Sequence, residues 1–308
     1  MQPFLLVNAG SGGGETQDSI VAAAEELHVE CHEVQPGDDF DEVLTAALDR
    51  GADLLIAAGG DGTLCAVADQ AMAHDVPMIV VPAGTRNHFA LDVGLDLDDP
   101  VAVFRASLTS GHERSVDVGS VNGATFLNNA SLGVYASAVG EDDYRDHKVK
   151  ALVGAARKSV SKDDGGQAHL STAVPGSALE DLGEAAPAVM VVNNAYSPTF
   201  SPGARLRPRL DSGEVWVYIG GGMERGENLV ASLAHAVDAA ITKQTLRAAF
   251  GAERVVISSD TPEVPIAVDG EHRPDLTAPF EFRSRKGALR LIVPDDPAPR
   301  EVQILLSW

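Results

Sequence analysis

Residues 54–64, Leu-Leu-Ile-Ala-Ala-Gly-Gly-Asp-Gly-Thr-Leu, place a short apolar run directly before a loop that contains three glycines. A continuous apolar run of this length is typical of a β-strand that is covered on both faces. The loop, Gly59–Thr63, leads into a segment of helical character that begins near Leu64. A strand, a glycine-rich turn and a helix in this order indicate an α/β sheet whose loops face a ligand.

Three further apolar runs in the first hundred residues alternate with helix-like segments in the same way. With the run just described, the predicted strands are Pro3–Asn8, His28–Val34, Asp53–Ala58 and Pro77–Val81. The segments between them are long enough for right-handed crossover helices, so we expect a doubly wound parallel sheet. Glycine-rich loops follow the first, third and fourth strands, which points all three to one crevice at the sheet edge.

The pattern changes beyond about residue 112 to short strands separated by turn residues, which predicts an all-β region. We therefore expect an α/β domain over residues 1–112 and an all-β domain over 113–300, with 301–308 as a strand that could return to the first domain. Two helices are expected to interrupt the second domain, over Lys148–Val160 and Glu227–Arg247.

Composition limits the classes of partner. The 308 residues include 45 acidic and 23 basic side chains, a formal net charge of -22, which argues against binding to nucleic acid. No run of about 18 uncharged apolar residues occurs, so we expect no integral membrane segment and a cytoplasmic protein with only peripheral membrane contact. Cys31 and Cys65 lie outside any paired-cysteine motif, which argues against disulfides and structural zinc.

The loop Gly59-Gly60-Asp61-Gly62-Thr63 suits phosphate, because glycines expose backbone N–H groups and the N-terminus of the following helix favours negative charge. Asp61 would repel phosphate unless it holds a divalent cation or accepts hydrogen bonds, so it indicates a metal–nucleotide complex. A tight turn in which Asp61 caps the helix is the alternative explanation for the same residues.

The loop after the next strand, Pro82–Ala90, supplies a second set of polar groups at the same edge. Thr85 and Asn87 offer neutral hydrogen-bond donors and Arg86 offers a cation, a combination suited to ribose and phosphate oxygens. Taken singly, the threonine and the asparagine are also ordinary capping residues beside a buried Phe89.

These two loops together resemble the diacylglycerol kinase catalytic-domain superfamily, which includes bacterial soluble lipid kinases and the sphingosine and ceramide kinases. The resemblance rests on AAGGDGTLCAVADQ and VPAGTRNHFALDVGL, and it extends to VNAGSGG, FLNNASLG and IAVDGE. It implies a Rossmann-like domain related to NAD kinases, a C-terminal β-sandwich, and ATP with Mg²⁺ in the reaction. The nucleotide-binding residues that it implies are Asn8, Gly59, Gly60, Asp61, Gly62, Thr63, Gly84, Thr85 and Asn87.

The segment Val268-Asp269-Gly270-Glu271 resembles the catalytic segment of the same superfamily. The resemblance implies that Glu271 is the general base, with Asp61 as the second catalytic residue. A carboxylate within hydrogen-bond reach of a hydroxyl aligns its attack and accepts its proton. Asp269 is expected to hold the loop or to interact with metal. Without the resemblance, the Asp-Gly pair predicts an ordinary hairpin turn.

The turn Asp211-Ser212-Gly213 resembles the magnesium-binding turn of bacterial members but departs from it, since the family has aspartate directly before the glycine. A hydroxyl is a weak magnesium ligand, so the site at Asp211 and Ser212 is either shifted or lost. The threonine that bacterial relatives carry near the end of the second strand is also missing around Glu33–Gln35, which removes one expected contact with adenosine or ribose.

Two basic groups would bring this acidic protein to an anionic lipid surface. Residues 145–162 predict an amphipathic basic helix, whose alternative is the solvated face of a domain helix. Arg205, Arg207 and Arg209 alternate along a predicted strand and form the second patch. Strand edges in the β domain would allow two protomers to pair as a homodimer.

The leading hypothesis is an ATP-dependent lipid kinase that phosphorylates a hydroxyl of diacylglycerol or a related lipid at a membrane surface. An NAD kinase-like enzyme is the nearest alternative, because NAD kinases share the Gly59–Thr63 motif, but the Pro82–Ala90 and Val268–Glu271 segments argue against it. A nucleotide-binding regulatory protein without transferase activity is a third possibility. The altered Asp211–Gly213 turn favours it, whereas retention of both Asp61 and Glu271 argues against it.

Overall fold

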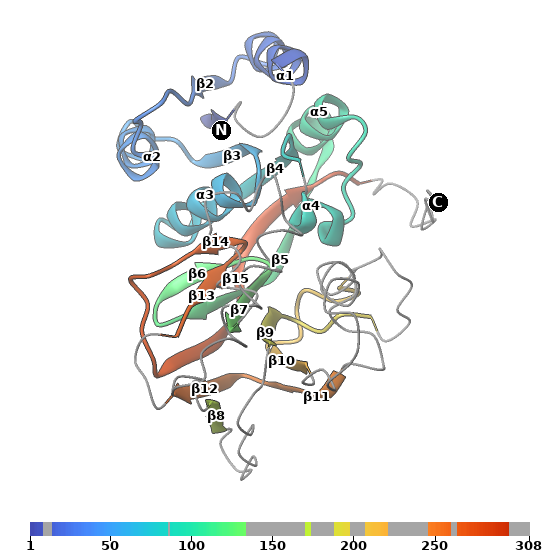
Figure 1. Ribbon diagram of the computed structural model, residues 1–308. Helices are drawn as coiled ribbons and strands as arrows, with labels where there is room; N and C mark the ends of the chain where they lie inside the picture. The colour runs from blue at the N-terminus through green and yellow to red at the C-terminus, as the bar shows by residue number, and fades with distance from the viewer. Residues whose placement is uncertain are drawn as a thin grey trace. The chain divides into compact units, whose positions relative to one another are not determined.

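The computed structural model describes residues 1–8, 14–85, 87–133, 170–173, 188–197, 207–220, 246–259 and 264–295 (Figure 1). The chain divides into two compact units, one comprising Met1–Val118 with the segment from Lys286 onward, the other Gly119–Arg285. The chain passes between the units within β5 (His112–Val121) and β15 (Phe280–Val293). The boundary at residue 112 stays a prediction, and residues 301–308 lie outside the described residues.

The first unit contains a parallel sheet with the strand order β2-β1-β3-β4. Leu5 of β1 lies opposite Cys31 of β2 on one side and Ile56 of β3 on the other, and all three strand pairs are parallel. The end of β15 joins β4 in parallel at Leu291. The four strands predicted from the apolar runs are confirmed as β1 (Pro3–Val7), β2 (Glu30–Glu33), β3 (Leu54–Gly59) and β4 (Met78–Pro82).

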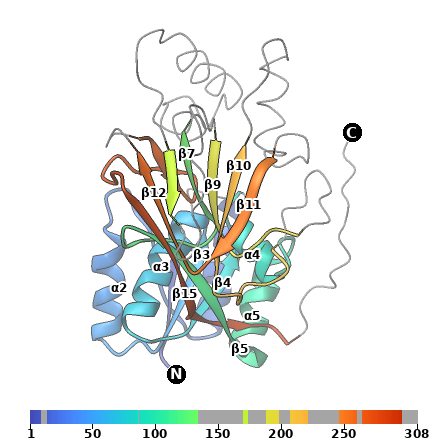
Figure 2. The ribbon, with the colours of Figure 1, turned by 90° about the horizontal axis from the view of Figure 1, so that it is seen from below.

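Helices cover both faces of this sheet, as expected for a doubly wound fold. Figures 1 and 2 show α2 and α3 on one face, and Figure 1 shows α1 and α5 on the other. Ile20 of α1 and Phe104 of α5 are fully buried in one core cluster with Leu5 and Ile56, which explains why β1, β3 and β4 are apolar throughout. The helices are α1 (Gly14–Glu26), α2 (Phe40–Asp49), α3 (Asp61–Ala73), α4 (His88–Val93) and α5 (Pro100–Ser110).

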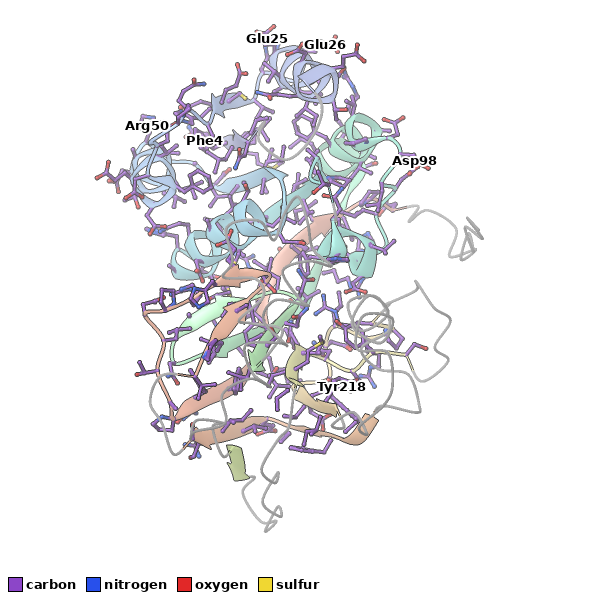
Figure 3. All side chains as sticks on the ribbon, viewed as in Figure 1. Phe4, Glu25, Glu26, Arg50, Asp98 and Tyr218 are labelled. Carbon is purple, nitrogen blue, oxygen red and sulfur yellow. The ribbon has the colours of Figure 1, made fainter. Side chains whose placement is uncertain are left out.

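Three labelled acidic side chains of the first unit lie on its exterior (Figure 3). Figure 3 shows Glu25, Glu26 and Asp98 pointing outward, whereas Phe4 lies inside. In the described part of the chain, no helix is both long and apolar enough to span a membrane. Glu25, Glu26 and Asp98 are exposed to solvent, where water stabilises their charges.

The second unit consists of two antiparallel sheets that pack around a common core. One sheet has the order β11-β10-β9-β7-β13-β14, and the other pairs β12 with β8 and with the first half of β15. Phe126 and Phe282 pack edge to face with their ring centroids 6.4 Å apart, in a cluster that also buries Val191 and Val217 of the first sheet. Its remaining strands are β6 (Ala124–Phe126), β7 (Asn129–Gly133), β8 (Leu170–Ala173), β9 (Ala188–Asn193), β10 (Val215–Gly220), β11 (Leu246–Ala252), β12 (Arg254–Ser259), β13 (Ile266–Val268) and β14 (Glu271–His272).

This architecture confirms the predicted fold class, an α/β unit joined to a β-sandwich. One predicted helix is wrong at its end, because Leu246 and Arg247 belong to β11 rather than to a helix. β11 pairs with β10 from Leu246 to Ala252, and this ladder outweighs the local helix propensity. The rest of that predicted helix, over 227–245, and the predicted basic helix over 145–162 lie outside the described residues.

Candidate active site

The carboxyl ends of β1 and β3 form the first part of the candidate site. β2 lies on one side of β1 while β3 and β4 lie on the other, and doubly wound sheets bind ligands at such a reversal of strand order. Asn8 follows β1, and its Nδ2 donates to Thr63 Oγ1 at 3.0 Å. A Cβ added at Gly59 would lie only 2.8 Å from this Oγ1. The glycine therefore leaves room for the side chain that joins the two loops.

The loops after β3 and β4 touch through their backbones at Gly60 and Gly84. A Cβ added at Gly84 would lie 2.5 Å from Gly60 Cα and 3.0 Å from Gly60 N, too close for any other residue without movement. Asn87, which has a φ of 46°, shapes this loop: its Oδ1 accepts from Gly84 N at 2.8 Å and its Nδ2 donates to Gly84 O at 2.7 Å. The Asn87 amide thus holds the loop, and its contact with nucleotide stays a prediction.

Asp61 occupies the first position of α3, directly after Gly60, which is the N-cap residue. Asp61 therefore belongs to the first turn of the helix. Gly60, and not Asp61, takes the capping position that the alternative explanation gave to Asp61. The Oδ1 atom of Asp61 is buried and has no hydrogen-bond partner within the described residues. A buried acceptor left without a donor costs on the order of 1–3 kcal/mol, more when it is charged. This oxygen is consequently placed to meet a cation or a donor that a ligand brings.

Two other nucleotide-binding residues that the resemblance implies are exposed, and some further residues of the loops lie outside the described part of the chain. Gly62 and Thr85 are exposed to solvent. Residues 9–13, which include most of the glycine-rich loop after β1, and Arg86 lie outside the described residues. The first unit thus brings together the seven residues Asn8, Gly59, Gly60, Asp61, Thr63, Gly84 and Asn87.

Glu271 belongs to the second unit, where it opens β14 in a tight hairpin with β13. Asp269 and Gly270 have φ angles of 47° and 85°, and Val268 pairs with Glu271 across the turn. Two consecutive residues of positive φ are typical of the type I′ turn that Asp-Gly favours. The Glu271 carboxylate is exposed and makes no hydrogen bond or ion pair with the residues that the structure describes. It is therefore available to a substrate.

Asp269 fastens this hairpin to the segment that precedes β7. Its Oδ2 accepts from the backbone N–H of Leu127 at 2.7 Å, and its Oδ1 accepts from those of Asn128 and Asn129 at 2.9 Å each. Its own backbone N–H donates to Asn129 O at 2.8 Å. The expectation that Asp269 holds the loop is confirmed, and the three N–H donors fix where the turn that carries Glu271 can lie.

The side chains of Asp211 and Ser212, the predicted magnesium ligands, both make contacts within the protein. Asp211 is exposed and its Oδ1 accepts from Arg209 Nε at 3.1 Å. The Ser212 backbone N–H and hydroxyl both donate to Asn194 Oδ1, at 2.9 and 2.6 Å. Across the described ranges, no three histidine, cysteine, aspartate or glutamate side chains gather to hold a metal. Magnesium binding at this turn stays a prediction that these contacts do not support.

Arg207 is interior, so the predicted surface patch of three arginines is wrong at this position. Its side chain is only 3% exposed, while Arg209 is exposed and Arg205 lies outside the described residues. Arg207 Nη1 donates to Leu127 O and to Asn193 O, both at 2.7 Å. Hydrogen bonds from a charged guanidinium to carbonyl oxygens are stronger than those between neutral groups, and they allow Arg207 to be buried. The alternation of Arg205, Arg207 and Arg209 in the sequence did not indicate that Arg207 is buried.

The chain matches a protein family over its first unit. Residues 2–121 match the diacylglycerol kinase catalytic domain. A probable lipid kinase of the YegS-like type from Pseudomonas aeruginosa is 35% identical over 158 residues, 50% of this chain and 50% of that protein. A diacylglycerol kinase from Bacillus subtilis is 41% identical over 101 residues, 32% of each chain. The chain thus spans about half the length of the curated relatives it matches, or less.

A solved structure extends the likeness in fold to nearly the whole chain. The crystal structure of a diacylglycerol kinase from Bacillus anthracis superposes with a TM-score of 0.67 at 19% sequence identity, and the match covers 96% of this chain and 97% of that one. At this identity the match speaks for the fold alone. The family match over residues 2–121, which contains both glycine-rich loops, agrees with the resemblance that these loops indicated.

Proposed function

We propose that this chain, a member of the diacylglycerol kinase catalytic-domain superfamily, transfers the γ-phosphate of ATP to a hydroxyl of diacylglycerol or a related lipid. One observation carries the proposal: the buried Asp61 Oδ1 lacks a partner in the described residues at the N-terminus of α3, beside two glycine loops in backbone contact. Such a site suits phosphates that arrive with a cation. The lipid as acceptor follows from the family and from its named relatives.

On the nucleotide side, the loops contribute backbone rather than side-chain groups. The first N–H groups of α3 have no partner within the helix and are suited to phosphate oxygens. Gly60 and Gly84 allow the two loops to lie against each other, and the hydrogen bond from Asn8 to Thr63 fixes the first loop against β1. Asp61 would hold the Mg²⁺ that accompanies ATP, and this ion supplies charge neutralisation on the phosphates.

On the acceptor side, Glu271 is the general base. As the lipid hydroxyl oxygen bonds to the γ-phosphorus, the bond from that phosphorus to the bridging oxygen of ADP breaks, and the hydroxyl proton passes to the Glu271 carboxylate. The products are a phosphorylated lipid and ADP. The exposed carboxylate and the turn fixed by Asp269 support this role. We place the reaction at a membrane surface, where the lipid acceptor resides.

The test is an acceptor screen with the purified full chain. The protein is incubated with γ-labelled ATP and Mg²⁺, together with diacylglycerol and related lipids in mixed micelles, and with NAD in a separate arm. We expect label in a lipid product. Label in NAD instead would identify the NAD kinase-like alternative, and ATP binding by calorimetry with no transfer to any acceptor would identify the regulatory alternative. Either result would overturn the proposal.

A further inference from the structure

We infer that Arg207 is a positioning residue for the catalytic turn, an inference that rests on the proposed role of Glu271. Arg207 lies far along the chain from this turn, yet both reach the same short segment, Leu127–Asn129. Arg207 donates hydrogen bonds to oxygen atoms of this segment, and Asp269 accepts hydrogen bonds from backbone N–H groups of the same segment. The position of Glu271 thereby depends on a buried cation in another part of the second unit.

The peptide unit between Leu127 and Asn128 shows this most clearly. Its carbonyl oxygen accepts from Arg207 Nη1 at 2.7 Å, and its N–H donates to Asp269 Oδ1 at 2.9 Å. Both hydrogen bonds involve a charged partner, and such bonds are about twice as strong as neutral ones. Two of them at opposite ends of one peptide dipole polarise it in the same sense and reinforce each other. The peptide is thus held from both sides.

Two further contacts make Arg207 an anchor between strands. Its Nη1 also donates to Asn193 O at the end of β9, and its Nη2 donates to Asn128 Oδ1 at 3.1 Å. β9 pairs with β7, and β7 pairs with the catalytic hairpin strand β13. Arg207 therefore ties the end of β9 to the segment that enters β7, directly beside the hydrogen bonds that Asp269 makes.

Loss of the Arg207 guanidinium would weaken the hold on the Leu127 carbonyl oxygen. Asn193 Nδ2 also donates to Leu127 O, but at 3.4 Å, so the shorter bond to this oxygen comes from Arg207. Without Arg207 the peptide keeps its bond to Asp269 and loses the shorter of the two bonds that oppose it. The segment and the attached turn would then shift, and misplacement of a reacting group by about 1 Å costs roughly 100-fold in rate.

The experiment compares Arg207→Met and Arg207→Lys with Arg283→Met, a control in the same unit whose arginine is exposed and paired with Glu281. Hydrogen exchange is measured at the amides of residues 127–129 and 266–272, and kcat and the KM for ATP are measured with the lipid that the acceptor screen identifies. We expect faster exchange at both segments in Arg207→Met, a kcat lower by roughly 10- to 100-fold and an unchanged KM for ATP. Arg207→Lys, which keeps the cation, should be intermediate.

Unchanged exchange at 266–272 in the Arg207→Lys and Arg207→Met proteins, relative to Arg283→Met, would overturn the inference. An equal loss of kcat in Arg283→Met would do the same. If Arg207→Met does not fold, the lysine variant decides, because it retains charge and loses only the forked geometry. A wild-type chain that phosphorylates no lipid would refute the proposed function instead, while the exchange measurements would still decide whether Arg207 holds the hairpin.

Discussion

Replacing Gly84 by alanine should weaken both ATP binding and the fold, each by a measurable amount. The added Cβ would lie 2.5 Å from Gly60 Cα, 2.8 Å from Asn87 Oδ1 and 3.0 Å from Gly60 N. Carbon atoms in contact are ordinarily about 3.5–4.0 Å apart, so the two loops must separate by about 1 Å. Backbone atoms provide two of these three contacts, and they cannot rotate out of the way as a flexible side chain would.

The expected magnitudes follow from this displacement. Overpacking of this kind costs about 1–3 kcal/mol of unfolding free energy. If separation of the loops breaks one hydrogen bond from the backbone to a charged phosphate, the loss is about 1.5–3 kcal/mol of binding free energy. That loss corresponds to a Kd for ATP higher by roughly 10- to 100-fold. Titration calorimetry with ATP and thermal unfolding of the same protein measure the two effects separately.

Gly94→Ala is the matched control for Gly84→Ala. Gly94 has a φ of 93°, but a Cβ there meets nothing within 4 Å. Alanine in this left-handed conformation costs about 1–2 kcal/mol, so stability falls to a similar extent without contact between the loops. We expect the control to bind ATP as the wild type does. An unchanged Kd for ATP in Gly84→Ala, or an equal loss in Gly94→Ala, would refute the reasoning.

Three other changes test separate parts of the account. Asp61→Ala should abolish phosphoryl transfer and should not lower the unfolding midpoint, because the buried Oδ1 has no partner in the described structure to lose; activity reduced only several-fold would make Asp61 structural. Asn8→Ala removes the 3.0 Å hydrogen bond to Thr63, and should cost about 1 kcal/mol by thermal unfolding and weaken ATP binding; unaltered stability and affinity would speak against this link. Hydrogen bonds from Arg254 and Arg283 lower the pKa of Glu281 from 4.5 to about 2, so its stabilising effect is complete above pH 4.5 and disappears as the pH falls toward 2. The difference in unfolding midpoint between wild type and Glu281→Gln should narrow over that window, and a difference that stays constant would contradict the assignment.

The first unit was predictable because its signals are local. β1, β3 and β4 are continuous apolar runs covered by helices, as Leu5 and Ile56 show, and each glycine-rich loop follows its strand directly. Strand order then places Asn8, Gly59 and Gly84 at one edge of the sheet. The sequence did not reveal that Asn87 turns its amide onto the loop backbone, because a donor available to a ligand and a donor used internally look alike in a sequence.

The second unit was less predictable because its decisive contacts join segments that are distant in the chain. Arg207 alternates with two other arginines and therefore reads as part of an exposed face, yet its partners are carbonyls 80 and 14 residues away. Leu246 and Arg247 end an alanine-rich segment that favours a helix, but pairing with β10 decides their conformation. Only the Asp-Gly turn before Glu271 is local, and its hairpin was foreseen.

The most direct test of the central claim is the single-turnover rate of Glu271→Gln with ATP and the lipid acceptor. Glutamine keeps the shape of the side chain but cannot take a proton, so we expect the rate to fall by roughly 10²- to 10⁴-fold, or about 3–5.5 kcal/mol of barrier, with ATP affinity unchanged. Asp275→Asn, which changes another exposed carboxylate that pairs with Arg273, is the control and should turn over normally. A Glu271→Gln protein with a near-normal single-turnover rate would contradict the assignment of Glu271 as the general base.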